Sequence, residues 1–466
     1  MSIIIPANSL SGGYAVDNSC RFNIASSDYL SRTLGSNGNR RTATWSAWIK
    51  KSNISAEQVF LSFGGSMNVG YTNGDSLRFN DGTGNALYSN NLQRDTSAWY
   101  HFVIAIDTTQ GTAANRVKMY INGVQVTSFA AAIYPDVNED LNMNQSSVTN
   151  TVGSANTSIY FNGYMAEVCW IDGQALDPTS FGEFDEDSGI WKPIDVSGLT
   201  FGTNGFYLDF EDSGALGADV SGNTNNFTVN NLTAIDQTTD TPTNNFATWN
   251  PLVKTSSTVT ISEGNTIGTE ATNGYYYGIV TTMFPTSGKW YGEMKFTSLG
   301  TVQTGFITEG TFIDGDRNLY SSSSSLYWQS GSTSISTVLN SSGVTTVVSG
   351  GSNSTSAFNS TNDIIMYAWD VDNGRAWFGI NGTWQNSGNP AGPTNWWSLP
   401  SDYAAGVSLF TTLCGCGVGT ATVNLNTGNP PFTGTDKTDD NNRGSFEYQP
   451  PDGFLSLCTA NLSEFG

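Results

Sequence analysis

Few residues in this 466-residue chain have the type and spacing that catalysis requires. The chain contains one histidine, His101, so a metal site built on two histidines cannot form. Any Ser-His-Asp or Cys-His catalytic site would have to include that residue. His101 lies within an apolar run from Trp99 to Asp107, which is typical of a buried strand. We therefore predict a packed structural imidazole at this position.

The five cysteines also lack the spacing of a metal or redox site. Their number is odd, and Cys414-Gly-Cys416 is not a Cys-x-x-Cys pair. Cys169 falls in an apolar run and is expected to be a small buried hydrophobic residue. This cysteine usage predicts synthesis in a reducing compartment.

Aromatic residues in Gly- and Pro-broken stretches are the best candidates for a binding function. Rings in loops can stack on sugar faces or anchor protein contacts, and the alternative is ordinary packing under the rim of a β-sandwich. The residues that we predict to form a binding surface are Tyr276, Trp384, Trp396 and Trp397.

Two segments have the pattern strand, Asn-Gly, strand, and each is expected to form a β-hairpin that sets the register of its sheet. Asn-Gly between alternating β-formers predicts a two-residue hairpin turn, because a type I′ turn needs positive φ at both positions. At Asn122-Gly123 this turn pairs Ile121 with Val124, and it pairs Met119 with Val126. The apolar face expected from this register comprises Val117, Met119, Ile121, Val124 and Val126.

The second turn, at Asn381-Gly382, sets Trp384 across from Gly379. A glycine there presents bare backbone, which can accept an indole ring against it.

Composition describes an all-β protein rich in turns. The chain has 51 glycines, 12 % charged and 12 % aromatic residues, and no long stretch with helical apolar spacing. The best candidate for a short helix has Asp177 as N-cap and Pro178 at the first helical position. The length suggests two domains, or three.

The net charge of −22 argues against nucleic acid as a partner, because binding a phosphate backbone requires clusters of Lys and Arg. The excess of acidic residues either keeps the protein soluble or binds divalent cations, whose ligands are Asp, Asn and backbone oxygens. The N-terminus lacks the basic start of a secretory signal, and no apolar run reaches the length of a membrane helix. We expect a soluble protein made in the cytoplasm, without membrane insertion.

The first part of the chain resembles laminin-G-like, concanavalin-A-like domains. The resemblance is carried by Trp45–Ile49, by Trp99–Asp107 leading into Met119–Gly123, and by Phe161–Val168. It implies a two-sheet antiparallel jelly roll whose rim binds glycans or calcium. Asp107 and Asn122 are the residues we single out for calcium, and no other cofactor is expected. The predicted strands are residues 44–50, 59–63, 76–79, 99–107, 116–121, 124–129, 158–161 and 164–171.

The later part resembles a SPRY domain, on the order and spacing of Gly288–Phe296, Gly305–Ile307 and Asp363–Gly382. SPRY domains are also two-sheet sandwiches, and the resemblance implies protein binding through loops. The fold predicted is two antiparallel two-sheet β-sandwiches joined by an extended connector. The predicted segments are an N-terminal docking segment (1–19), a first sandwich (20–184), a connector (185–255), a second sandwich (256–432) and a tail (433–466).

Some concanavalin-A-like sandwiches are glycosidases with a Glu-x-Asp-x-x-Glu pattern, in which the acid and the nucleophile lie close together. The closest match here begins at Glu183 and Asp185, but Ser188 stands in place of the final Glu. We predict that this stretch is a solvated acidic loop and that the chain is not an enzyme.

The opening of the chain (13–23), the connector (203–246) and the tail (448–462) resemble segments of structural proteins from marine bacteriophages. This resemblance implies a virion protein: a tail fibre or tail-associated adhesin that binds host-surface glycan or protein. A capsid-decorating protein or head fibre is the alternative, and a glycan-degrading enzyme is another. We expect a homo-oligomer in contact with other virion subunits, with residues 1–20 docking on another chain.

Overall fold

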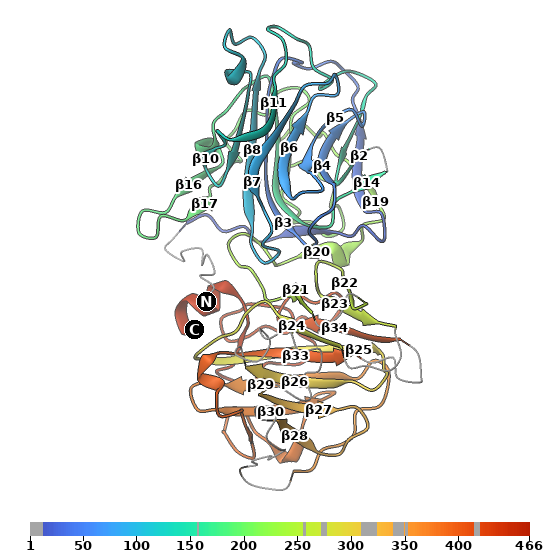
Figure 1. Cartoon of the computed structure of the whole chain (residues 1–466), viewed down its shortest axis with the longest axis vertical. Helices are drawn as coiled ribbons and strands as arrows, with labels where there is room; N and C mark the ends of the chain where they lie inside the picture. The colour runs from blue at the N-terminus through green and yellow to red at the C-terminus, as the bar shows by residue number, and fades with distance from the viewer. Residues whose placement is uncertain are drawn as a thin grey trace. The chain divides into compact units, whose positions relative to one another are not determined.

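The computed structural model describes residues 13–155, 158–254, 258–271, 277–308, 324–338, 349, 353–413 and 420–466. The chain divides into two compact units, with the division between Asn245 and Phe246. Each unit contains two large sheets, and many of their strands are labelled in Figure 1. Cys414, Cys416 and Tyr276 lie outside the described residues.

The first unit is an antiparallel β-sandwich, as the sequence predicts. One eight-stranded sheet consists of β10 (Val124–Gln125), β9 (Val117–Ile121), β8 (Tyr100–Asp107), β3 (Thr42–Lys51), β15 (Gly163–Asp172), β1 (Ser19–Phe22) and β20 (Gln237–Thr238), with β18 (Phe206–Leu208) paired to β15. The other consists of β11 (Phe129–Ile133), β7 (Ala86–Leu92), β6 (Ser76–Asn80), β5 (Met67–Tyr71), β4 (Gln58–Phe63), β12 (Thr149–Val152), β2 (Tyr29–Thr33) and β19 (Thr228–Asn230). Two small pairs are β13 (Ser154–Ala155) with β14 (Ile159–Tyr160), and β16 (Gly182–Phe184) with β17 (Trp191–Pro193).

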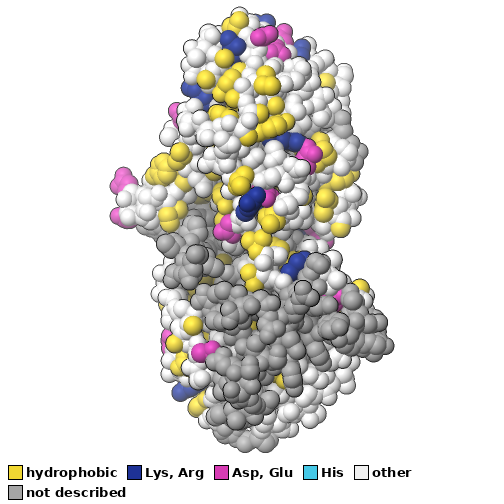
Figure 2. Space-filling model, in the orientation of Figure 1, with side chains coloured by type: hydrophobic (Ala, Val, Ile, Leu, Met, Phe, Trp, Pro, Cys, Tyr) yellow, Lys and Arg dark blue, Asp and Glu magenta, His cyan; other side chains and the backbone are white. Residues whose placement is uncertain are grey.

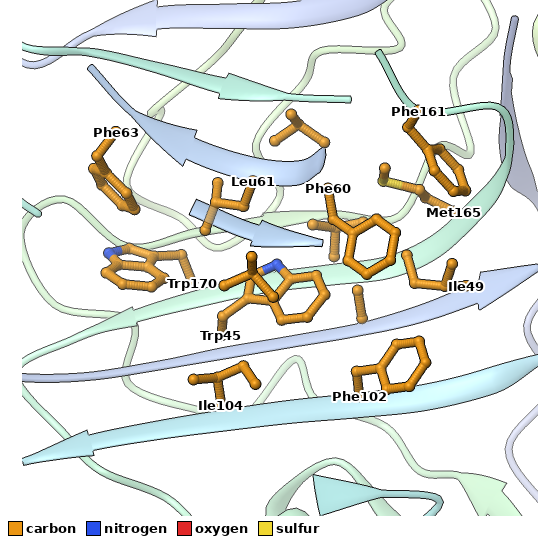
Figure 3. Close-up of a cluster of buried hydrophobic side chains, with 14 of the residues drawn as sticks. Trp45, Ile49, Phe60, Leu61, Phe63, Phe102, Ile104, Phe161, Met165 and Trp170 are labelled. Atoms are coloured by element: carbon orange, nitrogen blue, oxygen red, sulfur yellow. The ribbon is translucent and has the colours of Figure 1, made fainter. Parts of the chain in front are cut away.

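The core of the first unit is an aromatic and aliphatic layer between these sheets (Figure 3). The ring of Phe60 on β4 stacks on Trp45 of β3 at 5.7 Å and on Phe102 of β8 at 6.0 Å. Phe60 and Leu61 are consecutive, yet both are core residues. A register shift between Val59 and Leu61 explains this, since a β-bulge turns an extra side chain toward the same face.

The structure confirms the hairpin at Asn122-Gly123. These residues have φ of 47° and 77°, and β10 pairs Val124 with Ile121. The predicted apolar face is buried only in part, because Val124 at the tip remains 61 % exposed.

The predicted connector (185–255) is not a separate segment: its residues up to Asn245 belong to the first unit. β18 pairs with β15, β19 with β2 and β20 with β1, so these residues complete both sheets of the first unit. β19 and β20, of three and two residues, give too little alternation to be recognised in an Asn- and Thr-rich sequence, and their partners lie far away in the chain.

The second unit is also an antiparallel sandwich. Its six-stranded sheet consists of β21 (Trp249–Lys254), β24 (Tyr277–Thr281), β33 (Val407–Leu413), β26 (Gln303–Thr308), β27 (Ser325–Gln329) and β28 (Ile335–Val338). Its nine-stranded sheet consists of β22 (Thr260–Ser262), β23 (Ile267–Glu270), β34 (Ala421–Asn426), β25 (Lys289–Ser298), β29 (Ile364–Asp370), β30 (Arg375–Ile380) and β31 (Thr383–Trp384), with β32 (Trp397–Ser398) on β30 and β35 (Leu455–Ser456) on β25.

The second predicted hairpin is confirmed as well. Asn381 and Gly382 have φ of 47° and 83°, and Trp384 pairs with Gly379 as the register requires. A Cβ at position 379 would lie 3.1 Å from the sulfur of Met366, so a side chain there would require the methionine to shift.

The predicted C-terminal tail is an integral part of the second unit. β35 runs parallel to β25, and α3 (Thr459–Phe465) follows it. Phe446 and Phe454 of this segment are buried against the nine-stranded sheet. The polar composition of the tail concealed these two anchoring residues.

Helical structure in the described residues is sparse, as the composition predicts. Asp177 caps the short helix η2 (Pro178–Ser180) by accepting a 3.0 Å hydrogen bond from the Thr179 amide. The other single turns are η1 (Ala113–Asn115), η3 (Ala234–Asp236), η4 (Gln385–Ser387) and η5 (Tyr403–Ala405). Among the described helices, none has both the length and the apolar character needed to cross a membrane.

Candidate binding surface

The outer face of the nine-stranded sheet carries a cluster of aromatic side chains. Tyr291 pairs with Ala368, and Ala368 pairs with Trp377, so these three share one face. Their neighbours Trp369 and Phe378 point the other way, into the core, where both pack on Phe306. We call the following residues the aromatic cluster: Tyr291, Trp377, Trp384, Trp396, Phe446, Tyr448 and Phe454.

The structure brings two of the predicted binding residues together in this cluster. Trp384 and Trp396 are both half-buried, with one part against the sheet and one part open to solvent. The Trp384 ring lies 6.4 Å from that of Tyr291, and the Trp396 ring lies 6.5 Å from that of Trp377. The guanidinium of Arg375 lies 4.4 Å from the centre of the Trp396 ring, which is a cation–π distance.

Tyr448 is a third half-buried aromatic residue that sequence reasoning missed. Its ring packs against the turn at Gly382, where an added Cβ would lie 3.0 Å from Cε1 of the tyrosine. No local signal marked Tyr448, because its partners are about 65 residues away in sequence and the tail reads as polar.

The prediction that Trp397 lies on the surface is wrong. Its side chain is completely buried, its ring packs edge-on against Phe378, and its Nε1 donates a 3.0 Å hydrogen bond to Asn353. Trp397 begins β32 and pairs with Ala376 on the core face of β30, whereas the ring of Trp396 packs against Trp377 on the outer face.

A buried carboxyl group anchors the tail beneath the cluster. The two oxygens of Glu293 accept hydrogen bonds from the Tyr291 hydroxyl (2.9 Å), from Asn426 Nδ2 (3.0 Å), and from the amides of Glu447 (3.0 Å) and Tyr448 (2.8 Å). Burial raises the pKa of Glu293 to about 7, against these four hydrogen bonds, which favour the charged form. Glu293 thus holds Tyr448 in the cluster.

The structure does not bring the two predicted calcium ligands together. Asn122 accepts a 2.7 Å hydrogen bond from the His101 amide near the start of β8, whereas Asp107 is the last residue of that strand. Asp107 is bonded to Thr109 and Gln110 in its own turn. Among the described residues there is no group of three or more His, Cys, Asp or Glu side chains that could hold a metal ion. Asp107 and Asn122 therefore do not meet in a single calcium site.

His101 is a structural residue, as predicted. Its ring is buried, with Trp191 Nε1 donating to Nδ1 at 3.0 Å and Ser46 Oγ lying 2.8 Å from Nε2. Since Nδ1 accepts, Nε2 carries the proton and donates to the serine. Burial lowers the pKa of His101 to about 3.

Because His101 is the single histidine, its state can be measured directly. We expect the imidazole ¹⁵N signals to report the neutral Nε2–H tautomer from pH 8 down to about pH 5, well below the ordinary midpoint near 6.5. The same signals in urea-unfolded protein are the control and should titrate near that ordinary value. Titration of the folded protein near 6.5 would contradict the burial and tautomer assigned here.

The acidic stretch at Glu183–Ser188 is more ordered than predicted. Asp185 is buried and accepts hydrogen bonds from the amide and hydroxyl of Ser188, both at 2.9 Å, and from Lys192 at 3.2 Å. These hydrogen bonds, led by those from Ser188, lower the pKa of Asp185. Ser188 therefore stabilises a turn and does not supply the final carboxylate of the glycosidase pattern.

On the visible face of the first unit, charged side chains are scattered among uncharged ones (Figure 2).

A second buried carboxyl group, Glu167, ties the start of the described chain to the first unit. Its Oε2 accepts from Tyr207 at 2.8 Å and from Tyr14 at 3.3 Å, and burial raises its pKa to about 7. Val16, two residues later, is buried beside Trp48. Residues 14 and 16 of the predicted docking segment thus pack on their own unit.

A known family model matches part of the first unit. Residues 25–179 match the family model described as the concanavalin A-like lectin/glucanases superfamily (laminin G type). No curated protein matches the chain significantly.

Three solved structures are similar to parts of the chain. The SPRY domain of human HERC1 has 15 % identity and a TM-score of 0.28, over 38 % of this chain and 96 % of that one. A putative carbohydrate-binding protein from Bacteroides ovatus has 17 % identity and a TM-score of 0.35, over 47 % and 59 %. A pentraxin from Limulus polyphemus has 13 % identity and a TM-score of 0.26, over 35 % and 80 %. The match to the concanavalin A-like, laminin G-type model lies within the first antiparallel β-sandwich, and a second antiparallel β-sandwich follows it in the chain.

Proposed function

We propose that this chain is a non-enzymatic attachment protein of a bacteriophage virion that binds a host-surface glycan or protein. The observation that carries the binding function is the match of residues 25–179 to a lectin and glucanase superfamily. The virion role rests on the resemblance of residues 13–23, 203–246 and 448–462 to segments of phage structural proteins. The alternative position, as a capsid-decorating protein or head fibre, uses the same binding function.

The aromatic cluster supplies a contact surface for this function. Trp384, Trp396 and Tyr448 present partly open rings that are held by packing, so little conformational entropy is lost when a ligand binds. Aromatic faces of this kind stack on the apolar faces of sugars or anchor a protein partner. Arg375 adds guanidinium N–H donors beside Trp396 for hydroxyl or carboxylate groups.

Two features support a binding protein over an enzyme. The only histidine is buried with both ring nitrogens bonded, so it cannot reach a substrate. Glu183 and Asp185 are both engaged by Lys192, at 3.3 and 3.2 Å, and Ser188 stands at the position where the glycosidase pattern has its final Glu. Incubation with host capsule, lipopolysaccharide and β-glucans should release no reducing ends, and reproducible release would contradict this part of the proposal.

We expect Trp384→Ala and Trp396→Ala each to weaken binding about tenfold or more, as truncation of a central aromatic contact residue does. The measurement is binding of the full chain to host cells and to a glycan array. Phe184→Ala is the matched control, because it removes a ring that is 50 % exposed in the first unit, outside the aromatic cluster. Wild-type binding by both tryptophan variants would move the site away from the cluster, and failure of the wild-type chain to bind any host surface would refute attachment.

A further inference from the structure

A buried amine, a carboxylate and a carboxamide meet on the outer face of β3. Lys50 Nζ donates to Asp240 Oδ2 at 2.7 Å and to Asn245 Oδ1 at 2.6 Å. The Lys50 and Asp240 side chains are 1 % and 0 % exposed, and Asn245 is 8 % exposed as a residue. All three lie in the first unit, but about 190 residues of chain separate the lysine from the other two.

Aromatic groups line this site and orient its members. The indole Nε1 of Trp99 donates to Asp240 Oδ1 at 2.9 Å, and the Tyr164 ring centre lies 5.4 Å from Lys50 Nζ. The other end of the amide is also fixed, because Asn245 Nδ2 donates to the carbonyl of Ser97 at 2.5 Å. The amide oxygen is therefore directed at the lysine and its nitrogen away from it.

We propose that Lys50 and Asn245 become joined by an isopeptide bond, with Asp240 transferring the protons. An Nζ–Oδ1 distance of 2.6 Å puts the amine within about 4 Å of the amide carbon, since a C=O bond is about 1.2 Å long. That separation is close to the distance from which reacting groups held by a protein can combine. The neutral amine is the nucleophile in this reaction.

The reaction needs no co-reactant. Asp240 takes a proton from the Lys50 ammonium, and the neutral amine attacks Cγ of Asn245. Protonated Asp240 hydrogen-bonds to the oxygen that gains charge and shuttles a proton from the lysine nitrogen to Nδ2. The Cγ–Nδ2 bond then breaks, ammonia leaves, and an Nζ–Cγ amide remains beside a neutral Asp240 carboxyl group. No electrons are exchanged with any redox partner, and the buried ion pair is replaced by uncharged groups.

The site around Lys51, the next residue in the chain, provides a comparison for the Lys50 site. Lys51 is also fully buried, and its Nζ lies 2.7 Å from Asp75 and 4.2 Å from the ring centre of Tyr71. This second site thus has the amine, the carboxylate and the aromatic ring, but no hydrogen bond from Lys51 to a carboxamide is among the described contacts. We expect Lys51 to remain an ion pair.

The bond would fasten the end of the first unit to its central strand. Asn245 is the last residue of that unit, so tension applied along the chain from Phe246 would pass directly to β3. A protein without disulfides among its described cysteines could gain covalent strength in this way inside a reducing cytoplasm. The inference does not depend on the glycan-binding proposal.

Mass spectrometry of the purified full chain tests the inference. The intact mass should be lower than the sequence mass by one ammonia, and a protease digest should contain a branched peptide that joins Lys50 to residue 245. The branched peptide is decisive, because succinimide formation at an Asn-Gly pair also releases ammonia. A linear peptide with unmodified Lys50 in the folded protein would overturn the proposal.

Matched variants identify the reacting groups. Lys50→Arg keeps the positive charge and the hydrogen-bond donors but should remove the branched peptide and lower the melting temperature. Asp240→Asn should slow or abolish the cross-link in protein that still folds, as judged by near-UV circular dichroism. Lys51→Arg, at the second site, should leave the branched peptide unchanged. A branched peptide that persists in Lys50→Arg would refute the assignment, whether or not the other variants fold.

Discussion

Replacement of Lys51 by alanine is expected to lower the free energy of unfolding of the first unit by about 3–5 kcal/mol. The Lys51 and Asp75 side chains are both fully buried, and Asp75 also accepts a 2.7 Å hydrogen bond from the Ser55 amide. Removing the ammonium leaves a carboxylate in the interior without its buried counter-charge. Hydrogen exchange of β3 and β5 amides, followed against urea concentration, measures the loss locally.

Arg94→Ala is the control for this prediction. Arg94 contacts the same carboxylate at 3.3 Å, but its side chain is 58 % exposed, so its removal should cost less than about 1 kcal/mol. Equal effects of the two variants, or a Lys51→Ala protein as stable as the wild type, would show that the buried pair is not a major source of stability.

The same pair has a defined pH dependence. The hydrogen bond from Lys51 and its companions outweigh burial, which alone would raise the pKa of Asp75, and they lower it below its ordinary value. The carboxylate is therefore more acidic in the folded state, and its contribution is complete above a pH of about 4. It is lost as the pH falls further through the folded pKa, so this part of the first unit should be acid-sensitive only below about pH 4.

Replacement of Glu293 by alanine is expected to destabilise the second unit by roughly 3 kcal/mol or more, because it strips the acceptor from four donors that are mostly buried. Two of those donors are the backbone amides of Glu447 and Tyr448, so the tail should detach first. Faster proteolysis and hydrogen exchange at residues 446–448 would report this.

Glu447→Ala is the matched control, because it removes a neighbouring carboxylate and keeps the backbone amide that Glu293 binds. It should leave exchange in the tail near the wild-type rate. A Glu293→Ala protein with a tail as protected as that of wild type would show that the buried carboxyl group is dispensable.

The pH dependence of Glu293 has the opposite sign to that of Asp75. Burial raises its folded pKa to about 7, so the folded state favours the protonated form. Its contribution is complete below the unfolded value near 4.3 and is lost as the pH rises through about 7. Glu293→Gln, which cannot ionise, should remove this dependence, and an unchanged pH profile in that variant would assign the titration to another group.

The local turns and the class of fold follow from short stretches of the amino-acid sequence. Asn122-Gly123 and Asn381-Gly382 adopt positive φ and set the register that places Trp384 opposite Gly379. Such turns depend on two residues and their immediate neighbours, so their physics is fully contained in a short stretch of chain. The burial of His101 was predictable for the same reason, because it lies in a strand that is apolar on both faces.

Which side chains meet depends on strand pairing between distant parts of the chain. Trp396 and Trp397 are adjacent and chemically identical, and the pairing of Trp397 with Ala376 on β30 turns one outward and the other into the core. Tyr448 reaches the aromatic cluster because Glu293 binds its amide across 155 positions of sequence. Lys50, Asp240 and Asn245 likewise converge only after β20 closes the first sheet. Contacts of this range depend on strand register and on the burial of distant segments together, and neither is encoded within any one local stretch of chain.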